Sequence, residues 1–243
     1  MRASGPRGVA TTGPGTAPGI PSPVGPPPAI VAGRTGILGG TFDPVHMGHL
    51  AIAEEAREAL GMERVLLVPA GRPPHKPGRP IAPAADRVAM VEAAIDANPA
   101  FRLSRVEVDR PGPSFAVDTV EILAAAECAA GRKPDLWWIL SAEAFAAIAS
   151  WRDPDRLLAT CRMAVVPRAG AERPTPAWIE SCLPGAAGRV AVVDGPELGV
   201  SSSLIRERVA SGRSIRYLVP DAVGAYIAAH HLYVDTASRT RRP

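Results

Sequence analysis

The feature that most restricts the fold is an alternation of short apolar runs with longer amphipathic patterns, which begins near Arg34. The short runs are rich in Val, Ile and Leu, and the patterns between them space their apolar residues as helices do. Strands and helices in this order favour a parallel sheet with right-handed crossovers. We therefore predict an α/β fold with a doubly wound, mostly parallel sheet. The predicted strands are 35–38, 64–69, 101–108, 135–140, 162–167 and 189–194, and the predicted helices are 49–60, 84–97, 115–130, 142–151, 176–183, 201–212 and 218–233.

A single folded domain is predicted over residues 34–235. Gly, Pro, Ala and Thr dominate residues 1–33, where Arg2 and Arg7 are the only charges. Such a segment buries too little apolar surface to offset its ordering entropy, so we expect a disordered extension there. Residues 236–243 are expected to form a flexible tail. The apolar fraction of 47% and charged fraction of 21% are typical of a soluble globular protein.

The charge and the cysteine content of the chain indicate what kind of partner it binds and in which cellular compartment it is found. The net charge is +3, and no Lys/Arg tract resembles a nucleic-acid footprint, so a small anion is the expected charged partner. Cys128, Cys161 and Cys182 lack CxxC spacing, which predicts buried free thiols in a reducing compartment. No run approaches the roughly 20 apolar residues of a membrane span. We expect a cytoplasmic protein that binds neither nucleic acid nor membrane; a homo-oligomer stays open.

The stretch GILGGTFDPVHMGHL, residues 36–50, joins the first predicted strand to the first predicted helix. Gly39 and Gly40 let the backbone turn sharply and approach a ligand, and a helix N-terminus offers free N–H groups to an anion. The stretch matches neither GxGxxG nor GxxxxGK[ST]. We predict a phosphate-binding loop of another kind.

Two histidines follow these glycines. His46 and His49 are three residues apart, so both can face one bound anion, and each imidazole can donate a hydrogen bond to a phosphate oxygen. Zinc is the rival ligand, but a third ligand at sensible spacing is missing. We predict phosphate contacts for both histidines and no metal ligands.

With these residues in view, GGTFDPVHMGH resembles the signature of the nucleotidyltransferase superfamily that carries a T/HxGH motif and has a Rossmann-like fold. TFDPVH, together with PPHK downstream, is most similar to nicotinate mononucleotide adenylyltransferases. The resemblance implies transfer of AMP from ATP to nicotinate mononucleotide, a step of NAD biosynthesis that releases pyrophosphate. It implies Mg²⁺ bound mainly through the ATP phosphates. It also implies ATP contacts from Gly39, Gly40, Thr41 and Phe42.

A second stretch, GVSSSLIRERV at 199–209, resembles the family's second signature, in which serines and an arginine hold the ATP phosphates. Ser202 or Ser203 can cap the helix, and Arg206 can supply a charge-assisted contact. We assign ATP binding to the two serines. His46, His49 and Arg206 are the predicted catalytic residues, which stabilise charge during direct in-line transfer.

The acceptor mononucleotide is expected to meet residues from several loops. In the proline-stiffened loop 69–80, His75 and Lys76 match the family's PPHK and suit a monophosphate. RPGPSFAVDTVEIL, at 110–123, resembles a family stretch that usually carries Tyr and Thr where this chain has Phe115 and Ala116. Thr119 remains as a candidate contact.

ILSAEAFAAIASW, at 139–151, corresponds to a family segment that commonly reads G-x-D followed by a tryptophan. Ser141 and Glu143 replace the glycine and the aspartate, whereas Trp151 is retained and can stack on the nicotinate ring. Arg168 directly follows the predicted strand 162–167, at the carboxyl end, where a basic residue suits ligand phosphates. We predict mononucleotide binding by Glu143, Trp151 and Arg168.

Two alternatives stay open. The first is a related adenylyltransferase with another acceptor, either nicotinamide mononucleotide or phosphopantetheine. The second is a nucleotide-binding sensor without catalysis, motivated by the departures at Phe115, Ala116, Ser141 and Glu143. Intact HMGH and SSSLIR argue against the sensor, because a site without catalysis does not need contacts to the leaving group.

Overall fold

The computed structural model describes residues 28–73, 80–167, 173–195 and 198–234. Its centre is a six-stranded sheet in the order β3-β2-β1-β4-β5-β6, in which every neighbouring pair is parallel. The predicted doubly wound sheet is confirmed. Strand order reverses between β1 and β4, which is where sheets of this kind bind ligands. The strands are β1 (Val31–Gly40), β2 (Met62–Pro69), β3 (Phe101–Leu103), β4 (Asp135–Ser141), β5 (Arg162–Val166) and β6 (Val190–Val192).

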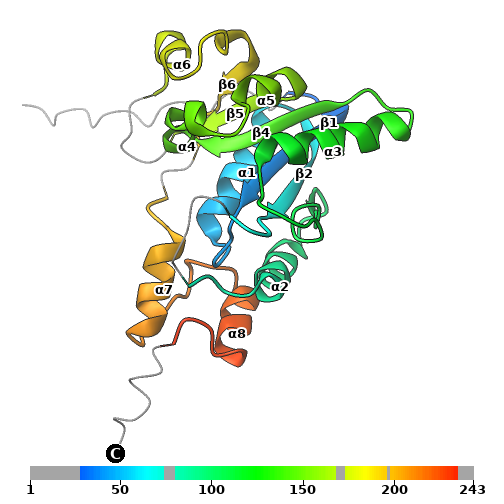
Figure 1. Ribbon diagram of the computed structural model, residues 1–243. Coiled ribbons are helices and arrows are strands. Elements are labelled where there is room, and N and C mark those ends of the chain that lie inside the picture. Colours follow the sequence, from blue (N-terminus) through cyan, green and yellow to red (C-terminus); the bar gives the residue numbers. More distant parts are fainter. Residues whose placement is uncertain (1–27, 74–79, 168–172, 196–197, 235–243) are drawn as a thin grey trace, which may run out of the picture.

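Helices pack on both faces of this sheet, and α7 and α8 lie together at the end where the chain finishes (Figure 1). The helices are α1 (Met47–Ala59), α2 (Ala84–Ile95), α3 (Ala116–Ala129), α4 (Ala142–Ala146), α5 (Pro154–Thr160), α6 (Pro176–Cys182), α7 (Ser202–Ala210) and α8 (Asp221–Ala229), with 3-10 turns η1 (Ile148–Ser150) and η2 (Ala187–Arg189).

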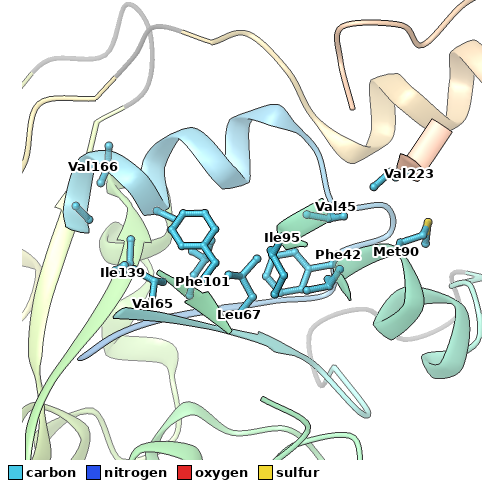
Figure 2. Packing of buried hydrophobic residues seen from close by; sticks show 14 of the residues in the cluster. Phe42, Val45, Val65, Leu67, Met90, Ile95, Phe101, Ile139, Val166 and Val223 are labelled. Carbon is cyan, nitrogen blue, oxygen red and sulfur yellow. The ribbon is translucent and has the colours of Figure 1, made fainter. Parts of the chain in front are cut away.

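The core consists of two apolar clusters, one on each face of the sheet. Consecutive strand residues point to opposite faces, so Leu38 joins the first cluster with α1, α2, α7 and α8, and Ile37 joins the second with α3 to α6. Leu67 and Val68 divide in the same way. Figure 2 shows members of the first cluster gathered against the sheet. Burial on both faces explains why the strand sequences are apolar throughout.

Several elements differ from their sequence predictions. The predicted helix 142–151 is divided into α4 and the 3-10 turn η1, and the predicted helix 218–233 is helical only over Asp221–Ala229. The first strand begins at Val31, whose N–H donates to the carbonyl of Gly61 over 2.8 Å, so 31–33 belong to the sheet and not to the extension. The third strand ends at Leu103, because the chain then turns and the Asp109 N–H donates to the Arg105 carbonyl. Helix α5 was missed. Its Pro154 fits the first turn of a helix, but the run after it is too short to show a period.

All three cysteines are free, as predicted. The expectation that they are buried holds for Cys161 but is wrong for Cys128, which lies on the solvent side of α3, and Cys182 is half-buried. Among the helices of the described residues, none is long and apolar enough to cross a membrane.

Candidate active site

The loop from β1 to α1 turns at Phe42 and not at the glycines. Phe42 has a left-handed φ of 50°, and a cis peptide bond joins Asp43 to Pro44, whereas neither Gly39 nor Gly40 adopts a positive φ. The predicted role of the glycines in the turn is therefore wrong. Gly39 is required for another reason, since a Cβ there would lie 2.6 Å from Trp138 Cζ2.

The side chain of Phe42 is 1% exposed, and its ring packs against Gly40 and edge-on against His49. Its ring is therefore part of the core, and the residue can meet a ligand only through its backbone.

His46 and His49 stack at the N-terminus of α1. His46 is the N-cap residue, and its N–H donates to Nδ1 of His49 over 3.2 Å. The ring centroids are 3.7 Å apart with 26° between the planes. Because Nδ1 of His49 accepts this bond, a neutral His49 carries its hydrogen on Nε2. The ring is therefore set up as a donor through Nε2, which is the form that a phosphate oxygen requires.

A small cavity of about 50 Å³ opens beside these rings; we call it the histidine cavity. A Cβ on Gly48 would lie 3.1 Å from Nδ1 of His46 and 3.7 Å from the Val200 carbonyl oxygen, so the glycine keeps this space open. The cavity connects α1 to the carboxyl ends of β4 and β5. Its lining residues are His46, Gly48, His49, Ile52, Ser141, Val166, Pro167, Leu198 and Val200.

A second cavity, of about 170 Å³, lies on the other side of the same loop; we call it the tryptophan cavity. The Trp138 and Trp151 rings meet edge to face there, with centroids 6.3 Å apart. Three residues that the sequence assigned to ATP, Gly39, Gly40 and Thr41, line this cavity and not the histidine cavity. The full lining is Gly39, Gly40, Thr41, Ala70, Pro73, Glu107, Ser114, Phe115, Ala116, Trp138, Trp151 and Arg152.

Helix α7 brings the second signature to the first loop. Ser202 donates from Oγ to the Pro44 carbonyl over 2.9 Å, and Arg206 donates to the Asp43 carbonyl and, over 3.0 Å, to Ser203 Oγ. The predicted cap is wrong, because the helix is capped by Ser201, whose Oγ accepts from the Leu204 N–H. Segments 158 residues apart therefore form one site.

Comparison with known proteins identifies the family of this chain. The cytidylyltransferase-like family matches residues 37–208. A probable nicotinate-nucleotide adenylyltransferase of Roseiflexus sp. (strain RS-1) is 48% identical over 82% of this chain and 96% of its own length. Another from Dehalococcoides mccartyi, strain ATCC BAA-2266, is 40% identical over 84% of this chain and 98% of its own. The chain belongs to the nicotinate-nucleotide adenylyltransferase family.

Solved structures with the same fold include the Plasmodium falciparum nicotinic acid mononucleotide adenylyltransferase. Its complex with APC has a TM-score of 0.66 and 16% identity, covering 82% of this chain and 96% of that one. Its complex with NaAD has a TM-score of 0.64 and 17% identity, covering 82% of this chain and 97% of that one. At sequence identities this low, the structural similarity shows the fold alone, and that fold is the Rossmann-like fold expected from the sequence.

In this family member, a buried polar network that the sequence analysis missed holds the first loop. The Asp43 carboxylate is 3% exposed and accepts from the Tyr233 hydroxyl over 2.8 Å and from the Ala82 N–H. Its other oxygen lies 3.5 Å from the Arg206 guanidinium. Burial raises the pKa of Tyr233, so its hydroxyl stays a donor. TFDPVH itself gives no sign of a partner 190 residues away.

Arg87 supports the same loop from α2. Its guanidinium is buried and donates to the carbonyls of Thr41, over 2.8 Å, and Ala82, over 3.0 Å. Burial lowers its pKa, although Asp43 nearby opposes that shift. Sequence reasoning missed Arg87, because the periodic pattern that predicts α2 does not distinguish a buried arginine from a solvated one.

Thr119 does not line the tryptophan cavity. It is fully buried and donates over 2.7 Å to Glu107, a residue that sequence reasoning missed and that does line the cavity. Glu107 is 5% exposed, and burial raises the pKa of its carboxyl above the usual range, while hydrogen bonds from Thr119 and Ser114 oppose the shift. Thr119 therefore orients a cavity residue and does not reach a ligand directly.

The remaining predicted residues fall into two groups. Glu143 is exposed in the first turn of α4 and lines neither the histidine nor the tryptophan cavity. His75, Lys76 and Arg168 lie outside the described residues.

Proposed function

We propose that the chain transfers AMP from ATP to nicotinate mononucleotide, giving nicotinate adenine dinucleotide and pyrophosphate. The observation that carries this proposal is the pair of cavities on either side of the loop after β1, one beside the stacked histidines and one lined by Trp151. Two sites over one anion-binding loop suit a reaction that joins two nucleotides through their phosphates. Relatives that are 48% and 40% identical over most of the chain support it by name.

The reaction proceeds by direct displacement. A 5′-phosphate oxygen of the mononucleotide attacks the α-phosphorus of ATP, the new P–O bond forms as the bond to the bridging oxygen breaks, and pyrophosphate leaves. No enzyme nucleophile takes part. Burial raises the pKa of the Cys161 thiol to about 12, so this residue supplies no thiolate at neutral pH.

The protein contributes position and positive charge. His49 donates from Nε2, His46 holds the stacked ring in place, and Arg206, fixed by Asp43 and Ser203, adds a guanidinium beside the loop. In this proposal His46, His49 and Arg206 stabilise the charge on the bridging and departing phosphate oxygens. The other proposed ATP contacts are Gly39, Gly40, Thr41, the Phe42 backbone, Ser202 and Ser203. The first three also line the tryptophan cavity, so in this proposal they lie between the two nucleotides.

The mononucleotide occupies the tryptophan cavity with its ring against Trp151. His75, Lys76 and Arg168 are proposed to bind its phosphate, and Thr119 acts through Glu107. Glu143, at the start of α4, stays a proposed contact from the sequence.

We propose Mg²⁺ as the metal ion of the reaction. It would be held mainly by ATP oxygens and water, and it would supply positive charge that neutralises the triphosphate. The chemistry of the first loop fits this arrangement, because His49 and Arg206 present donors to phosphate oxygens, while the carboxylate of the loop, Asp43, already accepts from Ala82 and Tyr233.

We place the reaction in the cytoplasm. The substrates ATP and nicotinate mononucleotide are small and charged, and the free thiols of Cys128, Cys161 and Cys182 suit a reducing compartment.

The test is pyrophosphate release by the purified chain with ATP and Mg²⁺, with nicotinate mononucleotide, nicotinamide mononucleotide or phosphopantetheine as acceptor. We expect turnover with nicotinate mononucleotide to be the fastest. Turnover confined to another acceptor would reassign the substrate, and a folded protein that binds ATP but is silent with all three would refute the proposal in favour of a sensor.

Two variants of His49 separate structure from chemistry. His49→Asn keeps an acceptor for the His46 N–H but removes the Nε2 donor, so we expect turnover to fall by about two to three orders of magnitude with a native melting temperature. His49→Gln can place a donor near the Nε2 position and should lose less. Near-normal turnover in His49→Asn would remove this histidine from the mechanism.

A further inference from the structure

Arg152 directly follows Trp151, and its side chain lines the tryptophan cavity. The guanidinium carbon lies 4.8 Å from the centroid of the Phe115 ring, which is a cation–π distance. Its Nε lies 3.7 Å from the Asp153 carboxylate, and the Arg152 side chain is 56% exposed. A long, exposed ion pair of this kind is weak, so the guanidinium can turn to a ligand anion at small cost.

Phe115 gives this arrangement its geometry. Phe115 offers a flat aromatic ring without a hydroxyl, and this ring also lines the tryptophan cavity. The ring face therefore supports a planar guanidinium at the wall of the cavity.

Among the described residues that line the tryptophan cavity, Arg152 is the positively charged one. The twelve residues around the tryptophan cavity include two ionisable ones, Glu107 and Arg152. Burial disfavours the charged form of Glu107, and the Thr119 hydroxyl donates to it. Glu107 therefore opposes an anionic ligand less than an ordinary carboxylate would, while Arg152 attracts one.

We propose that the Arg152 guanidinium, supported by the Phe115 ring, binds the carboxylate of the nicotinate ring and sets the preference for nicotinate over nicotinamide mononucleotide. The inference rests on the proposed function. The two mononucleotides differ at one substituent, which is a carboxylate in the first and a neutral carboxamide in the second. A cation at the cavity wall distinguishes these groups by charge, whereas the Trp151 ring stacks on both alike.

The test compares kcat/KM for the two mononucleotides in matched variants. Arg152→Gln should lower the nicotinate-to-nicotinamide ratio by about five- to tenfold, mainly by raising KM for the nicotinate form. Arg152→Lys should keep part of the preference for nicotinate, because lysine retains the positive charge. Phe115→Leu should lose part of the preference, because Arg152 remains but the aromatic ring that supports its guanidinium is gone.

Arg156→Gln is the control. Arg156 also lies near Asp153 and is 59% exposed, but it pairs with Glu121 and does not line the tryptophan cavity. The substitution Arg156→Gln also removes one positive charge close to Arg152, and it should leave the nicotinate-to-nicotinamide ratio of kcat/KM unchanged. Titration calorimetry with each mononucleotide and no ATP gives the same comparison without turnover.

The outcomes separate this inference from the function on which it rests. A wild-type preference for nicotinate that survives in Arg152→Gln would refute the role of Arg152 and leave the proposed function standing. An equal loss of the preference for nicotinate in Arg156→Gln would show that general surface charge causes the effect, and this would also refute the role of Arg152. Absence of both turnover and binding with either mononucleotide in the folded wild type would overturn both proposals.

Discussion

Tyr233 and Tyr226 offer a direct measurement of what burial adds to a hydrogen bond. Each hydroxyl donates to an aspartate over 2.8 Å, Tyr233 to Asp43 and Tyr226 to Asp86. Asp43 is 3% exposed, whereas Asp86 is half-buried. Substitution by phenylalanine removes only the hydroxyl in each case, so the pair differs chiefly in access of water to the carboxylate.

Tyr233→Phe takes a donor from a carboxylate that water cannot reach. A hydrogen bond to a charged group contributes about 1.5–3 kcal/mol, and water cannot replace this one. For a domain of this size that corresponds to a fall in Tm of roughly 3–12 °C. Water can replace the donor at Asp86, so Tyr226→Phe should cost at most about 1 kcal/mol.

Thermal and urea unfolding of the two variants beside the wild type check this difference at pH 7. The urea midpoint should fall clearly for Tyr233→Phe with an unchanged m-value. Equal losses in the two variants would refute the reasoning, because they would mean that the burial of Asp43 adds nothing to the contact.

Three further predictions concern the site and its supports. Glu107→Gln should raise Tm at pH 8 and leave it nearly unchanged at pH 4, because the raised pKa of Glu107 gives the fold a stability that is lost as pH rises; an equal effect at both pH values would contradict this. Gly39→Ala should weaken mononucleotide binding by displacing Trp138, and calorimetry that finds native affinity would oppose it. Ser201→Ala should lower the free energy of unfolding in urea by about 1 kcal/mol, because α7 loses its N-cap hydrogen bond; an unchanged free energy of unfolding would show that Ser201 is not the cap that stabilises α7.

The sequence predicts the fold where its signals are local and repeated. Apolar runs of strand length alternate with helical periods, and this order alone favours a parallel sheet. The signal fails where the structure depends on a single contact. The start of β1 depends on the pairing of Val31 with the chain near Gly61, and the end of β3 on a turn at Arg105.

The candidate site divides in the same way. His46, His49 and the serines stand in short contiguous motifs, so both loops could be located from the sequence. Their supports could not, because Arg87, Glu107 and Tyr233 are single residues whose burial follows from packing between distant segments. The glycines show a further limit: a motif glycine predicts freedom to turn, but the need at Gly39 is space for Trp138.

The contact between Asp43 and Tyr233 has a consequence for the order of folding. The two residues are 190 positions apart in the sequence. Closing a loop of that length costs conformational entropy, and this cost comes before the hydrogen bond can stabilise the fold. Strand pairs such as β1–β2 and helices such as α1 close over far shorter spans. We expect the sheet to form first and the phosphate-binding loop to gain its final rigidity last, once α8 has docked. A nascent chain would then acquire its shape well before it can process a nucleotide.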